Sequence, residues 1–230
     1  MKYKHIFFDL DHTLWDFEKN SELTLNTLYD EFKLRKYNVD SFSDFHSCYA
    51  TRSRELWKEF LDGLISHEDF QWKRMWLTMM DYNIDDRDLA FELNVRFQAI
   101  LPTQCTLMPF TNDILQYCKN HYAIHVLSNG THEVQSLKLQ CSGILPYFTE
   151  IITADQCNAF KPLPQIFDYA LKVTGATASN SLMVGDSLTM DIIGAKNAGW
   201  DQVLYNPMQT EHFDDPTFEI NQLNELMAII

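Results

Sequence analysis

The sequence predicts an α/β protein whose parallel sheet is interrupted, after its first strand, by a helical insertion. Short apolar runs alternate with helical patterns in the two outer parts of the chain, whereas residues 16–100 contain no comparable strand. The composition changes at the same place, because all six arginines fall within this middle segment. We therefore predict two units, one formed by 1–15 with 101–230 and the other by 16–100.

Five short apolar runs account for the predicted sheet. Each ends at polar residues or glycine, which favours a buried strand over a helix. Strands that alternate with helices form parallel sheets covered on both faces, and reactive groups gather beyond the carboxyl ends of such strands. The predicted strands are 4–8, 122–127, 150–153, 181–184 and 202–205.

The segments between the strands have helical spacing of apolar residues. Pro164 suits the first turn of a helix because its fixed φ and missing N–H are tolerated there, and Gly199 is a plausible helix stop. The predicted helices begin near Pro109, cover 133–141, run from 164 to about 173 and cover 189–198.

The middle segment shows four amphipathic helical patterns, the first of which includes Leu25 and Leu28. Trp72 and Trp76 are four residues apart, so we expect them in the core of a helical bundle. Arginines of this segment are expected mostly on solvated helix faces. The insertion is therefore predicted to be a four-helix domain.

Charge and cysteine usage exclude several classes of protein. The chain has 18 basic and 32 acidic side chains, a formal charge of −14, which argues against nucleic-acid polymers and anionic membranes as partners. No apolar run approaches the roughly 18 residues of a membrane span, and no signal peptide is expected. The five widely spaced cysteines include no C-x-x-C pair, which argues against zinc and a disulfide framework and favours a reduced, cytoplasmic setting.

A pair of carboxylates follows the first predicted strand. Asp9 and Asp11 lie two residues apart, with Thr13 next. Two carboxylates beyond a strand end can bind Mg²⁺, and one of them can attack phosphorus while the other transfers protons. An isolated D-x-D is more often a solvated turn, so this pair indicates a catalytic site only together with the other polar clusters of the chain.

Three further polar clusters occur at or after later strand ends. Ser128 and Asn129 could bind an oxyanion, although they also suit a helix N-cap. Lys161 could supply positive charge to a phosphoryl group, although a lone lysine is usually solvated. Asp186 could complete a metal site, and Asp191 could either join it or compensate a helix dipole.

The order of these four clusters resembles the haloacid dehalogenase-like (HAD) superfamily of phosphohydrolases. The resemblance implies a Rossmann-like core with a helical cap inserted after the first strand. It implies that Asp9 is the nucleophile and Asp11 the general acid and base. It also implies that Ser128 and Lys161 bind the phosphoryl group.

The same resemblance implies a metal site for Mg²⁺. Asp9, Asp186 and the backbone carbonyl of Asp11 are expected to hold the ion, with Asp191 in support. Thr13 and Asn129 are expected to support the bound substrate. Since two like charges ~4 Å apart repel by about 4 kcal/mol at an effective dielectric near 20, a phosphate ester beside these carboxylates needs a cation, and we expect no activity without metal.

The presence of Asp11 favours a phosphatase over a haloacid dehalogenase, a branch that lacks the second aspartate. The segment 11–18 and the helical cap resemble bacterial pyrimidine 5′-nucleotidases of this superfamily, which implies a nucleoside monophosphate as the small phosphorylated substrate. Trp15 and Phe17 are candidates for contact with its base. Alternatives are a phosphoglycolate- or sugar-phosphate-type phosphatase, a phosphomutase, or a non-catalytic interaction protein. The chain is expected to act as a monomer or homodimer.

Overall fold

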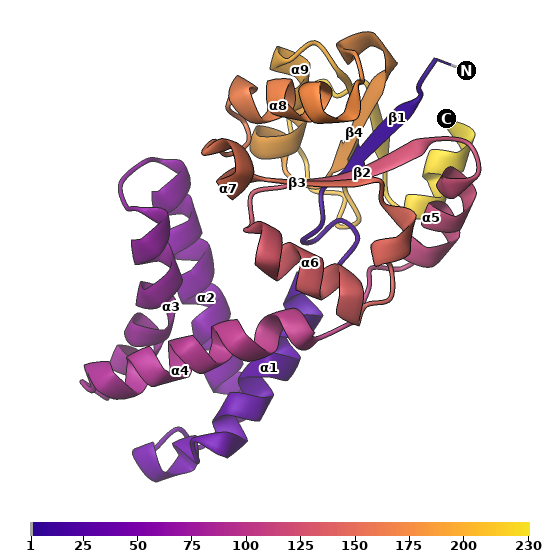
Figure 1. Ribbon diagram of the computed structural model, residues 1–230. Helices are drawn as coiled ribbons and strands as arrows, with labels where there is room; N and C mark the ends of the chain where they lie inside the picture. Colours follow the sequence, from indigo (N-terminus) through magenta and orange to yellow (C-terminus); the bar gives the residue numbers. More distant parts are fainter. Residues whose placement is uncertain (1) are drawn as a thin grey trace. The chain divides into compact units, whose positions relative to one another are not determined.

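The computed structural model describes residues 2–230. The chain divides into two compact units, one formed by residues up to Glu18 with Cys105–Ile230 and the other by Lys19–Gln104 (Figure 1). The predicted division at 15/16 and 100/101 lies within four residues of these limits. Within the described residues, no helix combines the length and the apolar character that a membrane span requires.

The first unit contains a six-stranded sheet in the order β3-β2-β1-β4-β5-β6, and every neighbouring pair is parallel. The predicted α/β fold class is therefore confirmed, and all five predicted strands are present. A sixth short strand was not predicted. The strands are β1 (His5–Phe8), β2 (Ala123–Ser128), β3 (Glu150–Thr153), β4 (Ser181–Gly185), β5 (Asp201–Tyr205) and β6 (Phe218–Ile220).

The register of the central strands brings their carboxyl ends together. Phe8, the last residue of β1, is aligned with Val126 of β2 and with Val184 of β4. The backbone N–H of Asp9 then donates to the carbonyl oxygen of Val184 at 2.9 Å, so the first residue after β1 is still hydrogen-bonded to β4. Polar residues that follow β1, β2 and β4 therefore meet at one edge of the sheet.

Helices cover both faces of this sheet. Figure 1 shows α8 and α9 on one side and α5 and α6 on the other. The predicted helix over 189–198 is a π-helical turn, Leu188–Ile193, that continues into α9. The helices of this unit are α5 (Thr111–Lys119), α6 (His132–Cys141), α7 (Ala154–Cys157), α8 (Pro164–Thr174) and α9 (Gly194–Asn197).

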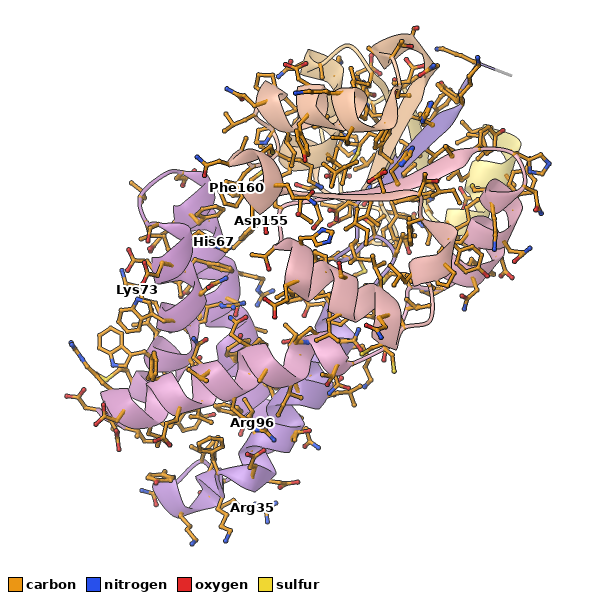
Figure 2. The ribbon with its side chains drawn as sticks, in the orientation of Figure 1. Arg35, His67, Lys73, Arg96, Asp155 and Phe160 are labelled. Carbon is orange, nitrogen blue, oxygen red and sulfur yellow. The ribbon has the colours of Figure 1, made fainter. Side chains whose placement is uncertain are left out.

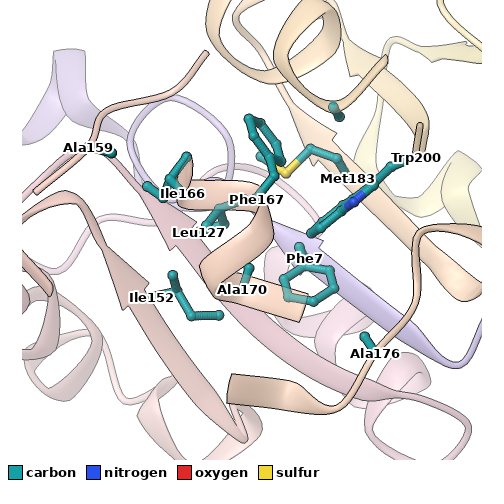
Figure 3. Close-up of a cluster of buried hydrophobic side chains, with 11 residues drawn as sticks. Phe7, Leu127, Ile152, Ala159, Ile166, Phe167, Ala170, Ala176, Met183 and Trp200 are labelled. Carbon is teal, nitrogen blue, oxygen red and sulfur yellow. The ribbon is translucent and has the colours of Figure 1, made fainter. Parts of the chain in front are cut away.

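A buried apolar cluster joins the sheet to α8 and α9 (Figure 3). The ring of Phe7 from β1 lies 4.6 Å from that of Trp200, and the ring of Phe167 from α8 contacts the same tryptophan edge to face. Burying a large side chain of this kind contributes roughly 1.5–3 kcal/mol. This packing anchors the strands whose ends carry the polar clusters.

The second unit is built of helices. Met75 and Met79 are buried in it, whereas Trp72 and Trp76 are only partly buried, so their predicted core positions are wrong. The rings of the two tryptophans contact each other in a tilted arrangement, with centroids 5.4 Å apart. Its helices are α1 (Phe17–Glu31, which starts in the first unit), α2 (Phe42–Leu61), α3 (His67–Asp81) and α4 (Arg87–Ile100).

The arginines of this unit have unlike environments. Arg96 pairs with Glu31 and Arg35 donates to a tyrosine hydroxyl, both at exposed or partly exposed positions (Figure 2). Arg74 instead is buried, with its guanidinium 4.5 Å from the centre of the Phe70 ring. Arg74 is an exception to the prediction that these arginines are mostly solvated, because contact with aromatic rings lets a guanidinium leave water.

Candidate active site

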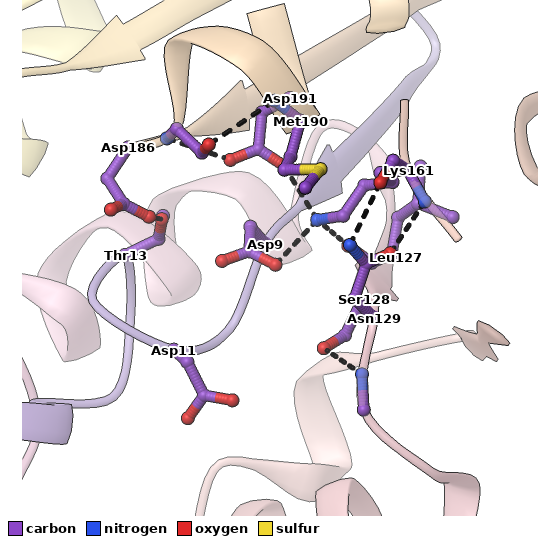
Figure 4. A network of polar contacts seen from close by, with 12 residues as sticks. Asp9, Asp11, Thr13, Leu127, Ser128, Asn129, Lys161, Asp186, Met190 and Asp191 are labelled. Atoms are coloured by element: carbon purple, nitrogen blue, oxygen red, sulfur yellow. Dashed lines mark hydrogen bonds and ion pairs between the residues drawn. The ribbon is translucent and has the colours of Figure 1, made fainter. Parts of the chain in front are cut away.

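The four polar clusters predicted from the sequence meet beyond the carboxyl ends of β1, β2 and β4 (Figure 4). Asp9 follows β1, Ser128 ends β2, and Asp186 follows Gly185 at the end of β4. Lys161 enters from the segment before α8. The topology thus assembles residues that lie up to 177 positions apart, from Asp9 to Asp186.

Lys161 is the central cation of the site. Its Nζ donates to Oδ1 of Asp9 at 2.6 Å, to Oδ1 of Asp191 at 2.6 Å and to the carbonyl oxygen of Leu127 at 2.7 Å. These three acceptors use all three donors of an ammonium group. Burial acts to lower the pKa of Lys161, but the carboxylates of Asp191 and Asp9 outweigh it and hold that pKa above its usual value. The lysine is therefore charged and fixed in place.

Asp191 is fully buried and is held at both oxygens. Oδ1 faces Lys161, and Oδ2 accepts from the backbone N–H of Ser187 at 3.0 Å. Gly185 makes room for this carboxylate, because a Cβ on Gly185 would lie 2.3 Å from Oδ2 of Asp191. The glycine at the end of β4 is thus required by the close approach of an acidic side chain.

Asp9, Asp186 and Asp191 form an acidic cluster in which one oxygen from each lies within 4.8 Å of the others. Burial raises the pKa of Asp9 to about 7, against the opposing effect of Lys161, and burial together with the charge of Asp9 raises the pKa of Asp186 to about 6. When all three are ionised, one ammonium faces three carboxylates, which leaves an excess of two negative charges. A divalent cation with oxygen ligands matches that excess.

Two carboxylate oxygens of this cluster face no protein donor. Thr13 donates to Oδ1 of Asp186 at 3.1 Å, and Lys161 takes Oδ1 of Asp9. Among the residues that the structure describes, neither Oδ2 of Asp9 nor Oδ2 of Asp186 accepts a hydrogen bond. Because no protein donor engages them, these two oxygens are available as ligands for a cation.

Asp11 lies apart from this cluster and is held by two residues that the sequence did not single out. Lys138 of α6 donates to both of its oxygens, at 2.6 and 2.8 Å, and Gln135 donates to Oδ2 at 3.0 Å. Burial acts to raise the pKa of Asp11, but Lys138 and Gln135 outweigh it and bring that pKa below its usual value. Gln135 and Lys138 are three residues apart on the helix that follows the second strand. Polar pairs with this spacing are common on exposed helix faces, so the sequence alone did not identify them as site residues.

Ser128 and Asn129 have different surroundings. Oγ of Ser128 accepts from the backbone N–H of Gly130 at 3.2 Å and from Gln135 at 2.6 Å, which leaves its own O–H free to donate to an incoming oxygen. Asn129 forms a reciprocal pair with the backbone of Lys161, accepting from its N–H at 2.6 Å and donating to its carbonyl oxygen at 3.1 Å. Asn129 thus fixes the backbone that carries Lys161.

The two aromatic residues expected to contact a substrate lie beside Lys138. Its ammonium is 4.6 Å from the centre of the Trp15 ring and 5.9 Å from that of Phe17. Trp15 is fully buried, whereas Phe17 is partly exposed. The Trp15 ring therefore packs against the ammonium of Lys138, and the Phe17 ring is more exposed to solvent than that of Trp15.

Comparison with known proteins assigns the family. The chain belongs to the haloacid dehalogenase-like hydrolases, whose family model matches residues 3–199. It is 29% identical over 231 residues to pyrimidine 5′-nucleotidase PynA of Streptococcus pneumoniae, which covers 99% of this chain and 94% of that one. It is also 29% identical to a glyceraldehyde 3-phosphate phosphatase of Methanothermobacter thermautotrophicus, with 90% of this chain and 88% of that one covered.

A solved structure shares the fold. The putative HAD-hydrolase YfnB of Bacillus subtilis, in a crystal form bound to magnesium, superimposes with a TM-score of 0.91 at 27% identity, covering 100% of this chain and 99% of that one. The predicted resemblance to HAD-like hydrolases is therefore confirmed. The two relatives of equal identity have different substrates in their names, so identity alone does not choose a substrate.

Proposed function

We propose that the protein is a Mg²⁺-dependent phosphomonoesterase that acts on pyrimidine nucleoside 5′-monophosphates. The observation that carries the phosphatase assignment is the contact of Asp9 with Lys161 at the sheet edge, with Ser128 and Asp186 on either side. The choice of substrate is supported by the similarity to PynA over nearly the whole chain. It is further supported by the resemblance of the loop 11–18 to that of pyrimidine 5′-nucleotidases.

In the proposed reaction, Asp9 is the nucleophile. A carboxylate oxygen of Asp9 bonds to phosphorus while the bond from phosphorus to the ester oxygen breaks. The electron pair stays on the ester oxygen, which takes a proton from the carboxyl group of Asp11. Water then attacks the phosphorus of the aspartyl phosphate and gives a proton to Asp11, while the bond from phosphorus to the Asp9 oxygen breaks. The electron pair of that bond returns to Asp9 as a carboxylate, and inorganic phosphate is released.

Lys161 and Ser128 are proposed to stabilise the phosphoryl group during both steps, Lys161 through its charge and Ser128 through its hydroxyl group. Lys161 already contacts Asp9, so its charge lies where negative charge develops on the transferring group. The free O–H of Ser128 supplies a neutral donor from the neighbouring strand. Thr13 and Asn129 act indirectly in this proposal, through Asp186 and through the backbone of Lys161.

The acidic cluster fits a magnesium ion. Asp9 and Asp186 would bind it with the oxygens that lack protein donors, with the backbone carbonyl of Asp11 as a further ligand, and Asp191 would support the site from beside Lys161. When bound, Mg²⁺ neutralises the carboxylates and the phosphate charge. Without it, the excess negative charge of the cluster repels a phosphate ester.

The helical unit is proposed to be the cap that selects the substrate, with Trp15 and Phe17 near the joint between the units. We place the enzyme in the cytoplasm, in keeping with the five free cysteines among the described residues. We propose that it acts as a monomer or homodimer.

A substrate panel tests the choice of ester. We expect kcat/KM for UMP, dUMP and dTMP to exceed that for AMP, glyceraldehyde 3-phosphate, phosphoglycolate and hexose phosphates, all measured with saturating Mg²⁺. Equal or better turnover of glyceraldehyde 3-phosphate or phosphoglycolate would overturn the nucleotidase proposal. In that case the phosphatase assignment would stand with a sugar- or carboxy-phosphate substrate, which the similarity to the archaeal phosphatase favours as the second candidate.

A further inference from the structure

Two side chains on one face of α6 hold both oxygens of Asp11. Lys138 donates to Oδ1 at 2.6 Å and to Oδ2 at 2.8 Å, and Gln135 donates to Oδ2 at 3.0 Å. Both residues lie more than 120 positions along the chain from Asp11. The carboxyl group of the catalytic loop is thus fixed from a helix that follows a different strand.

Lys138 is a buried lysine. Only 4% of its side chain is exposed, and its ammonium lies between Asp11 and the rings of Trp15 and Phe17. Removing an ammonium from water is costly unless it is paired and hydrogen-bonded, and Asp11 supplies that pairing. The aromatic rings close off the other side with favourable cation–π contact. Lys138 therefore has one defined position, unlike a solvated helix-face lysine.

Gln135 connects the same carboxyl group to the second loop of the site. Its Nε2 donates both to Asp11 and, at 2.6 Å, to Oγ of Ser128. Gly130 admits this side chain, because a Cβ on Gly130 would lie 2.7 Å from Cδ of Gln135. One face of α6 therefore sets the positions of a carboxyl group after β1 and a hydroxyl group at the end of β2.

We propose that Lys138 is the positioning residue for Asp11, with Gln135 as its partner, in the proton transfer to the leaving group. This inference rests on the proposed phosphomonoesterase function. In the free protein Lys138 and Gln135 favour the carboxylate form of Asp11. In the proton-transfer step one oxygen of Asp11 carries the proton, and Lys138 then donates to the other oxygen alone. The proton passes from Asp11 to the ester oxygen as the bond from that oxygen to phosphorus breaks.

The leaving group separates this role from simple structural damage. The nucleoside of UMP leaves as an alkoxide unless it is protonated, whereas p-nitrophenolate is a stable anion that leaves without a proton. The value of kcat/KM covers events up to the transfer of the phosphoryl group to Asp9. A positioning defect at Asp11 therefore lowers kcat/KM for UMP far more than for p-nitrophenyl phosphate.

The experiment compares Lys138→Met and Lys138→Arg with the parent protein on both esters. We expect Lys138→Met to lose about 100-fold in kcat/KM for UMP and less than tenfold for p-nitrophenyl phosphate, the pattern of a lost general acid. Lys138→Arg keeps two donors for the carboxyl group and should recover part of the UMP activity. Lys172→Met, at an exposed position of α8, is the matched control and should behave as the parent.

A double-mutant cycle with Asp11→Asn completes the test. If Lys138 acts through Asp11, the loss for UMP in the double variant is close to that of Asp11→Asn alone. Equal losses for the two esters in Lys138→Met, or a rise of KM for both with kcat unchanged, would overturn the proposal and indicate direct phosphate binding or general damage.

Failure of the proposed function gives a different result. A parent protein active on glyceraldehyde 3-phosphate but not on UMP would overturn the nucleotidase proposal alone. The Lys138 comparison would then be made with glyceraldehyde 3-phosphate, which also has an alkoxide leaving group. A parent protein inactive on all esters, p-nitrophenyl phosphate included, would overturn the phosphomonoesterase function and this inference with it.

Discussion

The ammonium of Lys161 lies 2.6 Å from Oδ1 of Asp9, and 2% of the lysine side chain is exposed. This contact joins the end of β1 to the segment before α8 and places a fixed positive charge beside the proposed nucleophile. Among the described residues, Lys161 is the only lysine or arginine that pairs with Asp9. Both activity and stability should therefore depend on it.

Lys161→Met should lower kcat at least about 100-fold, because a preorganised charge at the transferring group is lost. The variant should also lose about 3 kcal/mol in the free energy of unfolding at pH 8, since Asp9 and Asp191 are left buried without their cation. At pH 5 the loss should be smaller, because these carboxyl groups can take up protons. Urea unfolding at the two pH values measures this, and an equal loss at both would contradict it.

Without the metal, Asp9 and Asp186 of the acidic cluster should destabilise the protein as the pH rises. The pKa of Asp9 is raised to about 7 and that of Asp186 to about 6, so the folded chain binds protons that the unfolded chain has already released. The contribution of these two carboxyl groups to the free energy of unfolding in EDTA should therefore fall as the pH rises from about 4 to 7. Added Mg²⁺ should stabilise the protein more at pH 8 than at pH 5.

The control for this prediction is Asp186→Asn, which removes one titrating group and should therefore reduce this contribution in EDTA. Urea denaturation at unit steps of pH gives the free energies. The comparison uses the difference in free energy of unfolding, parent minus Asp186→Asn, which cancels the contribution of His125. If this difference stays constant or rises from pH 4 to 7, the acidic cluster is not the source of the predicted pH dependence.

The burial of His125 should lower the free energy of unfolding in acid. It is buried on the sheet, its ring lies 4.7 Å from that of Phe7, and burial lowers its pKa to about 4. The unfolded chain takes up a proton below its usual pKa of 6.5, and the folded chain does not until about pH 4. The free energy of unfolding therefore loses roughly 2–4 kcal/mol from this group as the pH falls through that window.

His125→Phe removes the titration and keeps an aromatic ring, so its unfolding free energy should vary less between pH 6.5 and 4 than that of the parent. His121→Gln, at an exposed position, should keep the parent's pH dependence. The prediction fails if the difference between parent and His125→Phe is constant over this range.

Gly185→Ala should displace Asp191, since the new Cβ would lie 2.3 Å from its Oδ2. A shift of about 1 Å in a catalytic site can cost roughly 100-fold in rate, and we expect that loss in kcat. Gly175→Ala is the control: Gly175 has φ +68° with open space around it, so alanine should cost about 1 kcal/mol of stability and leave kcat unchanged. Equal activity of the two variants would refute the assignment.

The sequence predicts the sheet and most of the site because those signals are local. Each of the five strands is a continuous apolar run, and Asp9, Ser128 and Asp186 lie at or just after strand ends that a parallel sheet brings together. The sixth strand, Phe218–Ile220, has three residues and follows a polar stretch, so its run is too short to be distinguished.

Other features depend on contacts that no local pattern encodes. Lys138 and Gln135 reach Asp11 across more than 120 residues, and their identities fit an ordinary solvated helix face. Arg74 is buried by aromatic rings from its own and neighbouring helices, which outweighs the preference of an arginine for water. In both cases tertiary packing determines the role of a side chain whose type alone predicts a surface position.

The measurement that tests the central claim most directly is phosphate release from UMP by the parent protein and by Asp9→Asn, with Mg²⁺ and with EDTA. Asp9→Asn keeps the size of the side chain and removes the nucleophilic carboxylate. We predict activity only in the parent with Mg²⁺, with losses of at least about 1000-fold in the other three conditions. Full activity of the parent in EDTA, or of Asp9→Asn with Mg²⁺, would contradict the account.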